Sequence, residues 1–338
     1  MTGLLLRLFL LAAVFAAVLL LNLCLGEVQL SVDEVLKCIS QYLKHADLSV
    51  DNSSFQILTD IRLPRALAAA LVGAALGISG YQLQSLSNNG LADPYLTGVS
   101  SGAGLAVAVS VIYGVDFAFI PLISLAGGLA ASFLVLFLSR TAEGISVTRL
   151  LLSGVALSAF CGALITLLIC SGQGSVRSQG IYYWLAGSVN GKSWADLGAT
   201  CVYIGLGCLI AGITSKSLRL LSLGSSTAAS LGLEVTKAQV AVLFSAILLC
   251  SAAVSLSGIV GFAGLVSPYF ARRLFGRDER VHLLSAGGIG AVLVLLSDLA
   301  ARTISGGQEP PLGTLLSLIG GPFFIYLLMK REDGVYRL

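Results

Sequence analysis

The segment GSVNGKS, residues 187–193, resembles a loop that cradles nucleotide phosphates. Such a loop needs four residues between its two glycines, followed by Lys and then Ser or Thr. Only three residues separate Gly187 from Gly191, so this spacing argues against a phosphate site. We therefore expect no nucleotide hydrolysis by this chain itself.

The remaining reactive side chains form no set that could hold a metal or catalyse a reaction. His45 and His282 each lack a second His, Cys or carboxylate at ligand spacing, so both are expected in solvated loops. The seven cysteines contain no CxxC pair and lie mostly in apolar runs, which favours buried thiols over a redox role. The sequence thus predicts neither an enzyme nor a cofactor in this chain.

The composition is typical of a membrane protein. Of the 338 residues, 56% are hydrophobic and 11% are charged, whereas soluble proteins average roughly 25% charged residues. Apolar runs of about 18 or more residues predict membrane-spanning helices. We expect an all-α polytopic membrane protein with ten transmembrane helices. They are predicted near residues 5–25, 63–83, 94–113, 117–138, 149–170, 194–213, 238–256, 259–275, 282–300 and 312–329.

The lysines and arginines predict the orientation, because these cations gather on the cytoplasmic side. Most of the 20 fall on the inner face when the N-terminus is placed inside. Both termini are then cytoplasmic, and residues 1–338 form a single transmembrane domain. Segments 26–61 and 171–193 are expected outside. Segment 214–237 is expected inside, as a pair of short amphipathic helices.

Two glycine-rich breaks interrupt the apolar pattern. SNNGLADPYLTGVSSGAG (87–104) includes Asp93 and Pro94, and SGIVGFAGLVSPY (257–269) lies in the second half of the chain. Non-helical backbone at membrane depth is tolerated only where protein buries it or where it lines a watery cavity. Paired interruptions in two halves of a chain occur at transport sites. An ordinary turn at the membrane boundary remains the alternative for the first break.

Three cations are predicted at the outer ends of spans, where the positive-inside rule disfavours them. They are Arg62, Arg65 and Arg302. They could be solvated charges, contacts to lipid headgroups, or a cationic platform for an acidic partner.

Small residues predict one close helix contact. Gly73 and Gly77 form a GxxxG motif, and Gly80 follows three residues later. Small residues let two helix backbones approach closely in lipid. We expect this motif to serve packing within the helix bundle.

Five sequence blocks, in one order, resemble the permease subunits of type II bacterial ABC importers. The blocks begin RLPRALAAALVGAALG, RLLLSGVAL, YYWLAGSVNGKSW, SGIVGFAGLVSPYFARRLFG and DLAARTISGGQEPPLG. Such permeases import iron-siderophore complexes, haem and cobalamin. The resemblance implies a type II ABC importer permease fold of ten transmembrane helices, working as a homodimer. It further implies two separate ATPase subunits that bind ATP and Mg in the cytoplasm, and an extracytoplasmic substrate-binding protein.

The resemblance also implies roles for single residues. Arg62, Arg65 and Arg302 match basic positions that pair with acidic residues of the binding protein. Segment 218–234 matches the coupling helices that sit in a groove of the ATPase. The coupling residues are Leu218, Leu221, Gly224, Ser225, Ala229, Leu231, Gly232, Leu233 and Glu234.

Two further pairs match gate positions of the family. Asn89 and Leu91 match a cytoplasmic constriction, and Val147 and Thr148 match a second gate. The chain departs from the family near the first gate, because Gly90 stands where members commonly have Pro. It departs again at Tyr269, where members usually have His, so a proton-linked role at that position is not expected.

The sequence therefore predicts a permease subunit of the bacterial inner membrane, part of an ATP-driven importer. Its expected cargo is a metal chelate, iron-siderophore or haem, moved by alternating access in a homodimer. A cobalamin importer is the alternative. An ATP-independent secondary transporter is a further alternative from another class, with Asp93 and Asp298 as its candidate ion-coupling residues.

Overall fold

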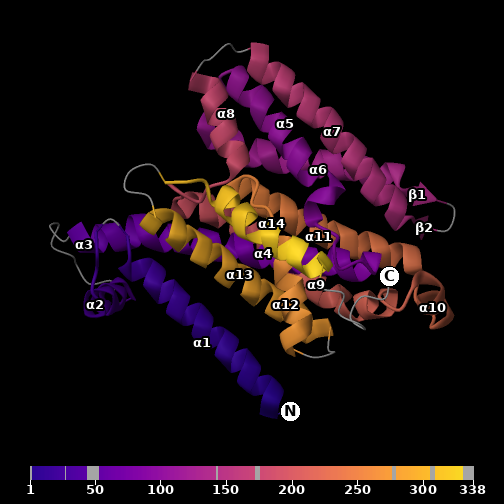
Figure 1. Cartoon of the computed structure of the whole chain (residues 1–338), viewed down its shortest axis with the longest axis horizontal. Coiled ribbons are helices and arrows are strands. Elements are labelled where there is room, and N and C mark those ends of the chain that lie inside the picture. Colours follow the sequence, from indigo (N-terminus) through magenta and orange to yellow (C-terminus); the bar gives the residue numbers. More distant parts are fainter. Residues whose placement is uncertain are drawn as a thin grey trace.

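The computed structural model describes residues 2–26, 28–43, 53–141, 144–171, 176–275, 279–304 and 309–329. Almost all of these residues are helical (Figure 1). The α-helices are α1 (Thr2–Cys24), α2 (Val32–Leu43), α3 (Ser53–Gln56), α4 (Leu63–Ser87), α5 (Val99–Ile112), α6 (Ile120–Leu138), α7 (Val147–Ser171), α8 (Val176–Ala186), α9 (Trp194–Leu221), α10 (Ser225–Ser230), α11 (Val235–Ser257), α12 (Ala263–Phe275), α13 (Glu279–Ile304) and α14 (Leu312–Met329).

Short elements join some of these helices. A π-helical turn, η1 (Ile57–Arg62), connects α3 to α4, and the 3-10 turns η2 (Pro94–Thr97) and η3 (Phe117–Phe119) precede α5 and α6. The strands β1 (Arg140–Thr141) and β2 (Gly144–Ile145) pair in an antiparallel hairpin before α7.

Seven helical segments in the described ranges are long and apolar enough to cross a membrane. They contain α1, α4, α6, α7, α9, α11 and α13. Helices α5 and α14 are shorter apolar helices, and α12 has 13 residues. Each expected span coincides with one of these helices, which confirms the all-α polytopic class. The count of ten spans is compatible with this arrangement and stays a prediction.

The structure corrects three expected segments. The span expected at 94–113 is interrupted, because Gly98 takes a left-handed conformation (φ +83°) between η2 and α5. The span expected at 259–275 begins only at Ala263. Helix α9 continues to Leu221, so the expected pair of short helices in 214–237 is wrong, and α10 is the one separate short helix there.

Side-chain hydrogen bonds explain why α9 continues through polar residues. The Thr214 hydroxyl donates to the Ile210 carbonyl (2.8 Å), and the Ser215 hydroxyl donates to the Gly212 carbonyl (2.8 Å). Both hydroxyls are therefore satisfied within the helix and need no water. Their polarity alone suggested a helix end that the structure does not have.

Helix α4 lies in the middle of the molecule and is buried on almost every face (Figure 1). Its glycines permit this position. A Cβ added to Gly73 would lie 2.2 Å from the Gly290 carbonyl oxygen of α13, and one added to Gly77 would lie 2.2 Å from the Ala286 oxygen. A Cβ added to Gly80 would lie 1.8 Å from the Gly264 carbonyl oxygen of α12. The expected packing role of this motif is confirmed.

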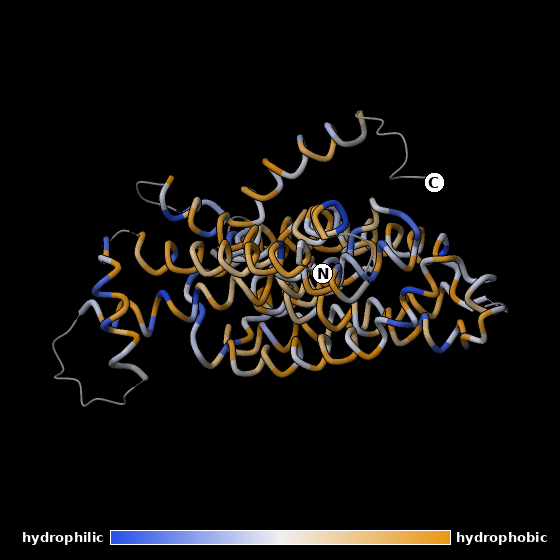
Figure 2. The backbone as a smooth tube through the Cα atoms, turned by 90° about the horizontal axis from the view of Figure 1, so that it is seen from below, coloured by the Kyte–Doolittle hydropathy of each residue, from blue (hydrophilic) through white to orange (hydrophobic). Residues whose placement is uncertain are grey.

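The helices form two groups beside one another. Helices α5, α6, α7 and α8 lie together, and α9 and α11–α14 surround α4 (Figure 1). Helix α1 leans away from the second group toward its N-terminal end. Hydrophobic residues fill most of the length of the helices, and hydrophilic residues gather toward their two ends (Figure 2).

The short surface helices occupy opposite ends of the molecule. Helices α2, α3 and α8 lie at one end, and α10 lies at the other with the β1–β2 hairpin (Figure 1). The first end contains the described parts of the segments expected outside the membrane. Residues 44–52, including His45, and residues 172–175 lie outside the described residues, as do residues 330–338 with the expected cytoplasmic C-terminus.

Candidate functional site

The first break is a compact cap between two helices. Asn88 ends α4 in a left-handed conformation (φ 49°), and its N–H donates to the Gln84 carbonyl. The Asn89 side-chain oxygen accepts from the Leu91 N–H (2.9 Å). The Asp93 carboxylate accepts from the Tyr95 N–H (2.8 Å) and so caps η2. The polar residues of this break therefore satisfy backbone groups at helix ends.

The second break lies against the first. The Tyr95 hydroxyl donates to the Val260 carbonyl (3.0 Å), and the Val260 N–H donates back to that hydroxyl (3.0 Å). Pro94 also packs here, since a Cβ added to Gly264 would lie 2.9 Å from its Cδ. The two breaks, 165 residues apart at this contact, form one irregular junction between the spans.

The backbone of the second break is strained at Phe262. This bulky residue has φ +64°, a backbone conformation that residues other than glycine rarely adopt. Its ring lies against α14, because a Cβ added to Gly320 would lie 2.4 Å from the Phe262 Cγ. Such strain persists only where the surroundings hold it, and it is common at switch regions.

The first glycine of GSVNGKS also lies at this junction. Gly187 has φ +77°, and a Cβ there would lie 2.3 Å from the Ile259 carbonyl oxygen. The Ser188 N–H donates to the Ser257 carbonyl (2.7 Å). The segment thus contacts the end of α11 and the second break, which accounts for Gly187 without a nucleotide.

The expected gate residues lie on two separate elements. Asn89 and exposed Leu91 belong to the first break, and Val147 and Thr148 begin α7. Among the described residues, no hydrogen bond joins the two pairs. Their gating roles stay predictions.

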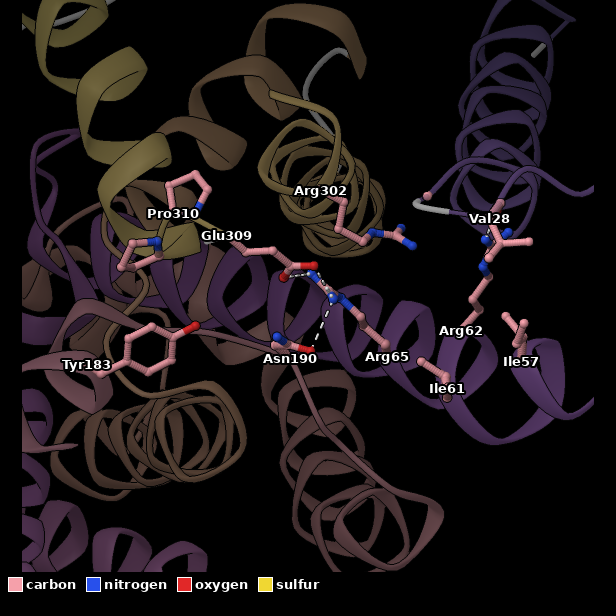
Figure 3. Close-up of a pocket in the computed structure, with 12 residues that line it drawn as sticks. Val28, Ile57, Ile61, Arg62, Arg65, Tyr183, Asn190, Arg302, Glu309 and Pro310 are labelled. Carbon is pink, nitrogen blue, oxygen red and sulfur yellow. Dashed lines mark hydrogen bonds and ion pairs between the residues drawn. The ribbon is translucent and has the colours of Figure 1, made fainter. Parts of the chain in front are cut away.

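A cavity of about 910 Å³ opens at the other end of α4 (Figure 3). We call it the outer arginine cavity. Its polar lining residues are Arg62, Arg65, Tyr183, Asn190, Arg302 and Glu309. Of the alternatives for these three cations, freely solvated charges do not fit, because Arg62 and Arg65 are only 5% and 6% exposed and the Arg302 side chain is 7% exposed. Their role in docking stays a prediction.

Every nitrogen of the Arg65 guanidinium is engaged within the chain. Its Nη2 contacts Asp298 Oδ1 (2.8 Å) and Glu309 Oε2 (2.7 Å). Its Nε donates to Asp298 (2.9 Å), and its Nη1 donates to Glu309 Oε1 (3.1 Å) and to Asn190 (3.2 Å). Burial of this cation is tolerated because two carboxylates face it.

The other two arginines hold the end of α1. Arg62 Nη1 donates to the carbonyls of Leu23 (2.6 Å) and Cys24 (3.0 Å). Arg302 donates to the Asn22 side chain (2.5 Å) and pairs with Asp298 (3.2 Å). The last carbonyls of a helix lack partners within it, and cations favour that end. These arginines therefore complete α1.

Sequence reasoning missed the two carboxylates that organise this cavity. Asp298 was considered only as a candidate for ion coupling, and Glu309 was given no role. One local signal existed, because Asp298 and Arg302 are four residues apart on one helix, the spacing of an ion pair. The links from Arg65 to Asp298 and Glu309 span 233 and 244 residues and leave no local pattern.

The expected coupling segment divides into an anchor and an exposed part. Leu218 and Leu221 are buried in the chain's own core, so their side chains are not free to touch an ATPase. Leu223 and Leu231 flank α10 and are each 59% exposed. Gly224, Ser225, Ala229, Gly232 and Glu234 lie around them, none of them buried, and Leu233 packs partly against the core.

His282 differs from expectation. It lies in α13 and is buried, 6% exposed, with its Nδ1 3.0 Å from the Tyr81 hydroxyl. The sequence placed it in a solvated loop because no ligand partner lies at the right spacing, but α13 starts at Glu279 and includes it.

Residues 13–330 match the model of the FecCD transport family. The chain belongs to this family. It is 37% identical over 293 residues to the hemin transport system permease protein HmuU of Yersinia pestis, covering 84% of this chain and 86% of that protein. It is 33% identical to the iron(3+)-hydroxamate import system permease protein FhuB of Bacillus subtilis, covering 93% and 80%.

A solved structure supports the same assignment. An inward-facing metal-chelate type ABC transporter matches with a TM-score of 0.84 and 29% identity, over 96% of this chain and 98% of that one. This chain is therefore an ABC importer permease, a multi-pass inner-membrane subunit and no enzyme. Family members work with separate ATPase and substrate-binding partners.

Proposed function

We propose that two copies of this chain form the translocation path of an importer for a bulky metal chelate, haem or iron-siderophore. The junction of the two breaks carries this proposal. Broken helices at a common point suit a path that opens alternately to either side. The alternative cargo is cobalamin, because the chain is also 35% identical to the vitamin B12 import system permease protein BtuC of Vibrio vulnificus.

In this proposal the two ends of the chain meet different partners. The end with α10 faces the cytoplasm, together with both termini. There, exposed Leu223 and Leu231 of each copy sit in a groove of one of the two ATPase subunits, which bind ATP and Mg. Segments 26–61 and 171–193 face outward, where the outer arginine cavity receives a substrate-binding protein. The gates are Asn89 with Leu91 and Val147 with Thr148.

Reconstituted uptake tests the proposal. The permease and its ATPase are placed in proteoliposomes and supplied with a binding protein loaded with hemin, ferric hydroxamate or vitamin B12 in turn. ATP-dependent accumulation of hemin or ferric hydroxamate supports the main proposal, and accumulation of vitamin B12 supports the alternative. Accumulation without ATP or ATPase contradicts both and indicates a secondary carrier.

A further inference from the structure

The outer arginine cavity holds more positive than negative charge. Among the described residues that line it or pair with its arginines, three guanidinium groups face the carboxylates of Asp298 and Glu309. In the part of the chain that the structure describes, Arg302 Nε is buried without a hydrogen-bond partner. A cavity with excess positive charge and an unused donor favours an anionic occupant.

The two carboxylates are held very differently. The Asp298 side chain is 1% exposed and pairs with both Arg65 (2.8 Å) and Arg302 (3.2 Å). The Glu309 side chain is 25% exposed, and its ion pair is with Arg65 (2.7 Å). Removing a buried carboxylate from two cations costs far more than moving a part-exposed one into water. Glu309 is therefore the carboxylate that can separate from its arginine.

We propose that Glu309 is an internal occupant of the site that receives an acidic side chain of the binding protein. Docking then exchanges the Glu309 carboxylate on Arg65 for the partner's carboxylate, with Asp298 staying in place. This inference rests on the proposed function, because it assumes docking at this cavity. Glu309 would set the docking affinity by competition, and a partner must present a carboxylate that reaches Arg65.

The position of Glu309 connects this exchange to the translocation path. Glu309 is followed by Pro310 and Pro311, and then α14 begins. A Cβ added to Gly313 of α14 would lie 2.5 Å from the Ile259 carbonyl oxygen in the second break. The carboxylate that docking releases is thus attached, through a stiff pair of prolines, to the helix end that touches the break.

The test compares Glu309→Gln with wild type in the purified permease–ATPase complex. Two probes are titrated: the binding protein that supports uptake, and hexaglutamate as a simple carboxylate ligand. We expect both to bind roughly tenfold more tightly to the Gln variant, a change of about 1.4 kcal/mol. The difference should shrink as salt is raised, because exposed charges are screened.

Two further variants serve as controls for position and for charge. Asp60→Asn removes an exposed carboxylate of the η1 turn, in the chain just before Arg65, that does not line the cavity, and this variant should bind both probes like wild type. Glu309→Asp keeps the charge with a shorter reach, and its affinity should lie between wild type and the Gln variant. A melting temperature for each variant identifies any loss of folding.

The outcomes separate the two proposals. If the binding protein docks on wild type and Glu309→Gln binds neither probe more tightly, the exchange is wrong while docking stands. If no binding protein docks but hexaglutamate binds the Gln variant more tightly, the competition is supported and the docking assignment fails. If no binding protein docks and hexaglutamate does not bind the Gln variant more tightly, the exchange and the docking assignment are both wrong.

Discussion

The Tyr95 hydroxyl is bonded to both backbone groups of Val260, accepting from its N–H and donating to its carbonyl at 3.0 Å each. One side chain thus satisfies two backbone groups of a buried residue that is in no helix. Because Tyr95 belongs to the first break and Val260 to the second, this contact fixes the position of each break relative to the other.

Replacing Tyr95 with Phe should loosen this junction. The change leaves the Val260 N–H and carbonyl without their partner, at a cost of about 1–3 kcal/mol. We expect a lower melting temperature and weaker coupling of ATP hydrolysis to uptake in proteoliposomes. Tyr113→Phe is the control, because Tyr113 is 79% exposed. If the two variants had the same melting temperature and the same coupling of ATP hydrolysis to uptake, the junction would have no such role.

Replacing Gly73 with Ala should separate α4 from α13. The added methyl would meet the Gly290 backbone at 2.2 Å, and backbone cannot move aside as a flexible side chain can. Overpacking costs about 1–3 kcal/mol or more, so yield and melting temperature should fall. Gly205→Ala adds the same methyl in α9 where nothing lies within 4 Å, and should be tolerated. A Gly73 variant with the yield and melting temperature of wild type would contradict this close packing.

Replacing Asp298 with Asn should destabilise the permease strongly. It removes a buried charge shared by Arg65 and Arg302, and breaking a buried ion pair costs about 3–5 kcal/mol. Glu234→Gln breaks the exposed pair with Lys237 and should leave the melting temperature nearly unchanged, because water screens exposed charges. Melting temperatures of the two variants in the same detergent give the comparison, and similar values would refute the structural role.

Replacements of Asp93 separate a helix cap from an ion-coupling group. Asn caps helices about as well as Asp, whereas Ala costs about 0.5–2 kcal/mol. Asp93→Asn should therefore keep ATP-driven uptake near wild type, and Asp93→Ala should lower the melting temperature. If the Asn variant loses uptake while remaining folded, the carboxylate has a role beyond capping η2.

Replacing Leu231 with Glu should weaken assembly with the ATPase. Leu231 is 59% exposed beside α10, and a charge there would have to be desolvated in a partner's groove. We expect at least tenfold less ATPase to co-purify with the variant, the equivalent of about 1.4 kcal/mol. Leu36→Glu changes an exposed leucine at the opposite end of the molecule and should assemble normally. Normal assembly of the Leu231 variant would exclude this surface.

Much of the fold follows from local sequence. Apolar runs located the spans, and the GxxxG motif located the close packing of α4, because both depend on residues within a few turns of one helix. The caps of the first break were also foreseeable, since Asn89 and Asp93 bond to backbone within two residues. The family resemblance supplied the type of transporter.

Relations between distant residues came only from the tertiary structure. The sequence placed Arg62, Arg65 and Arg302 at the outer ends of helices but left their partners open, because it could not say which other helix ends converge there. The structure brings Asp298 and Glu309 to Arg65 and the end of α1 to Arg62. A buried cation is stable only beside such partners. Whether an arginine is a free rim charge or an internal one therefore depends on helix packing, which local patterns do not encode.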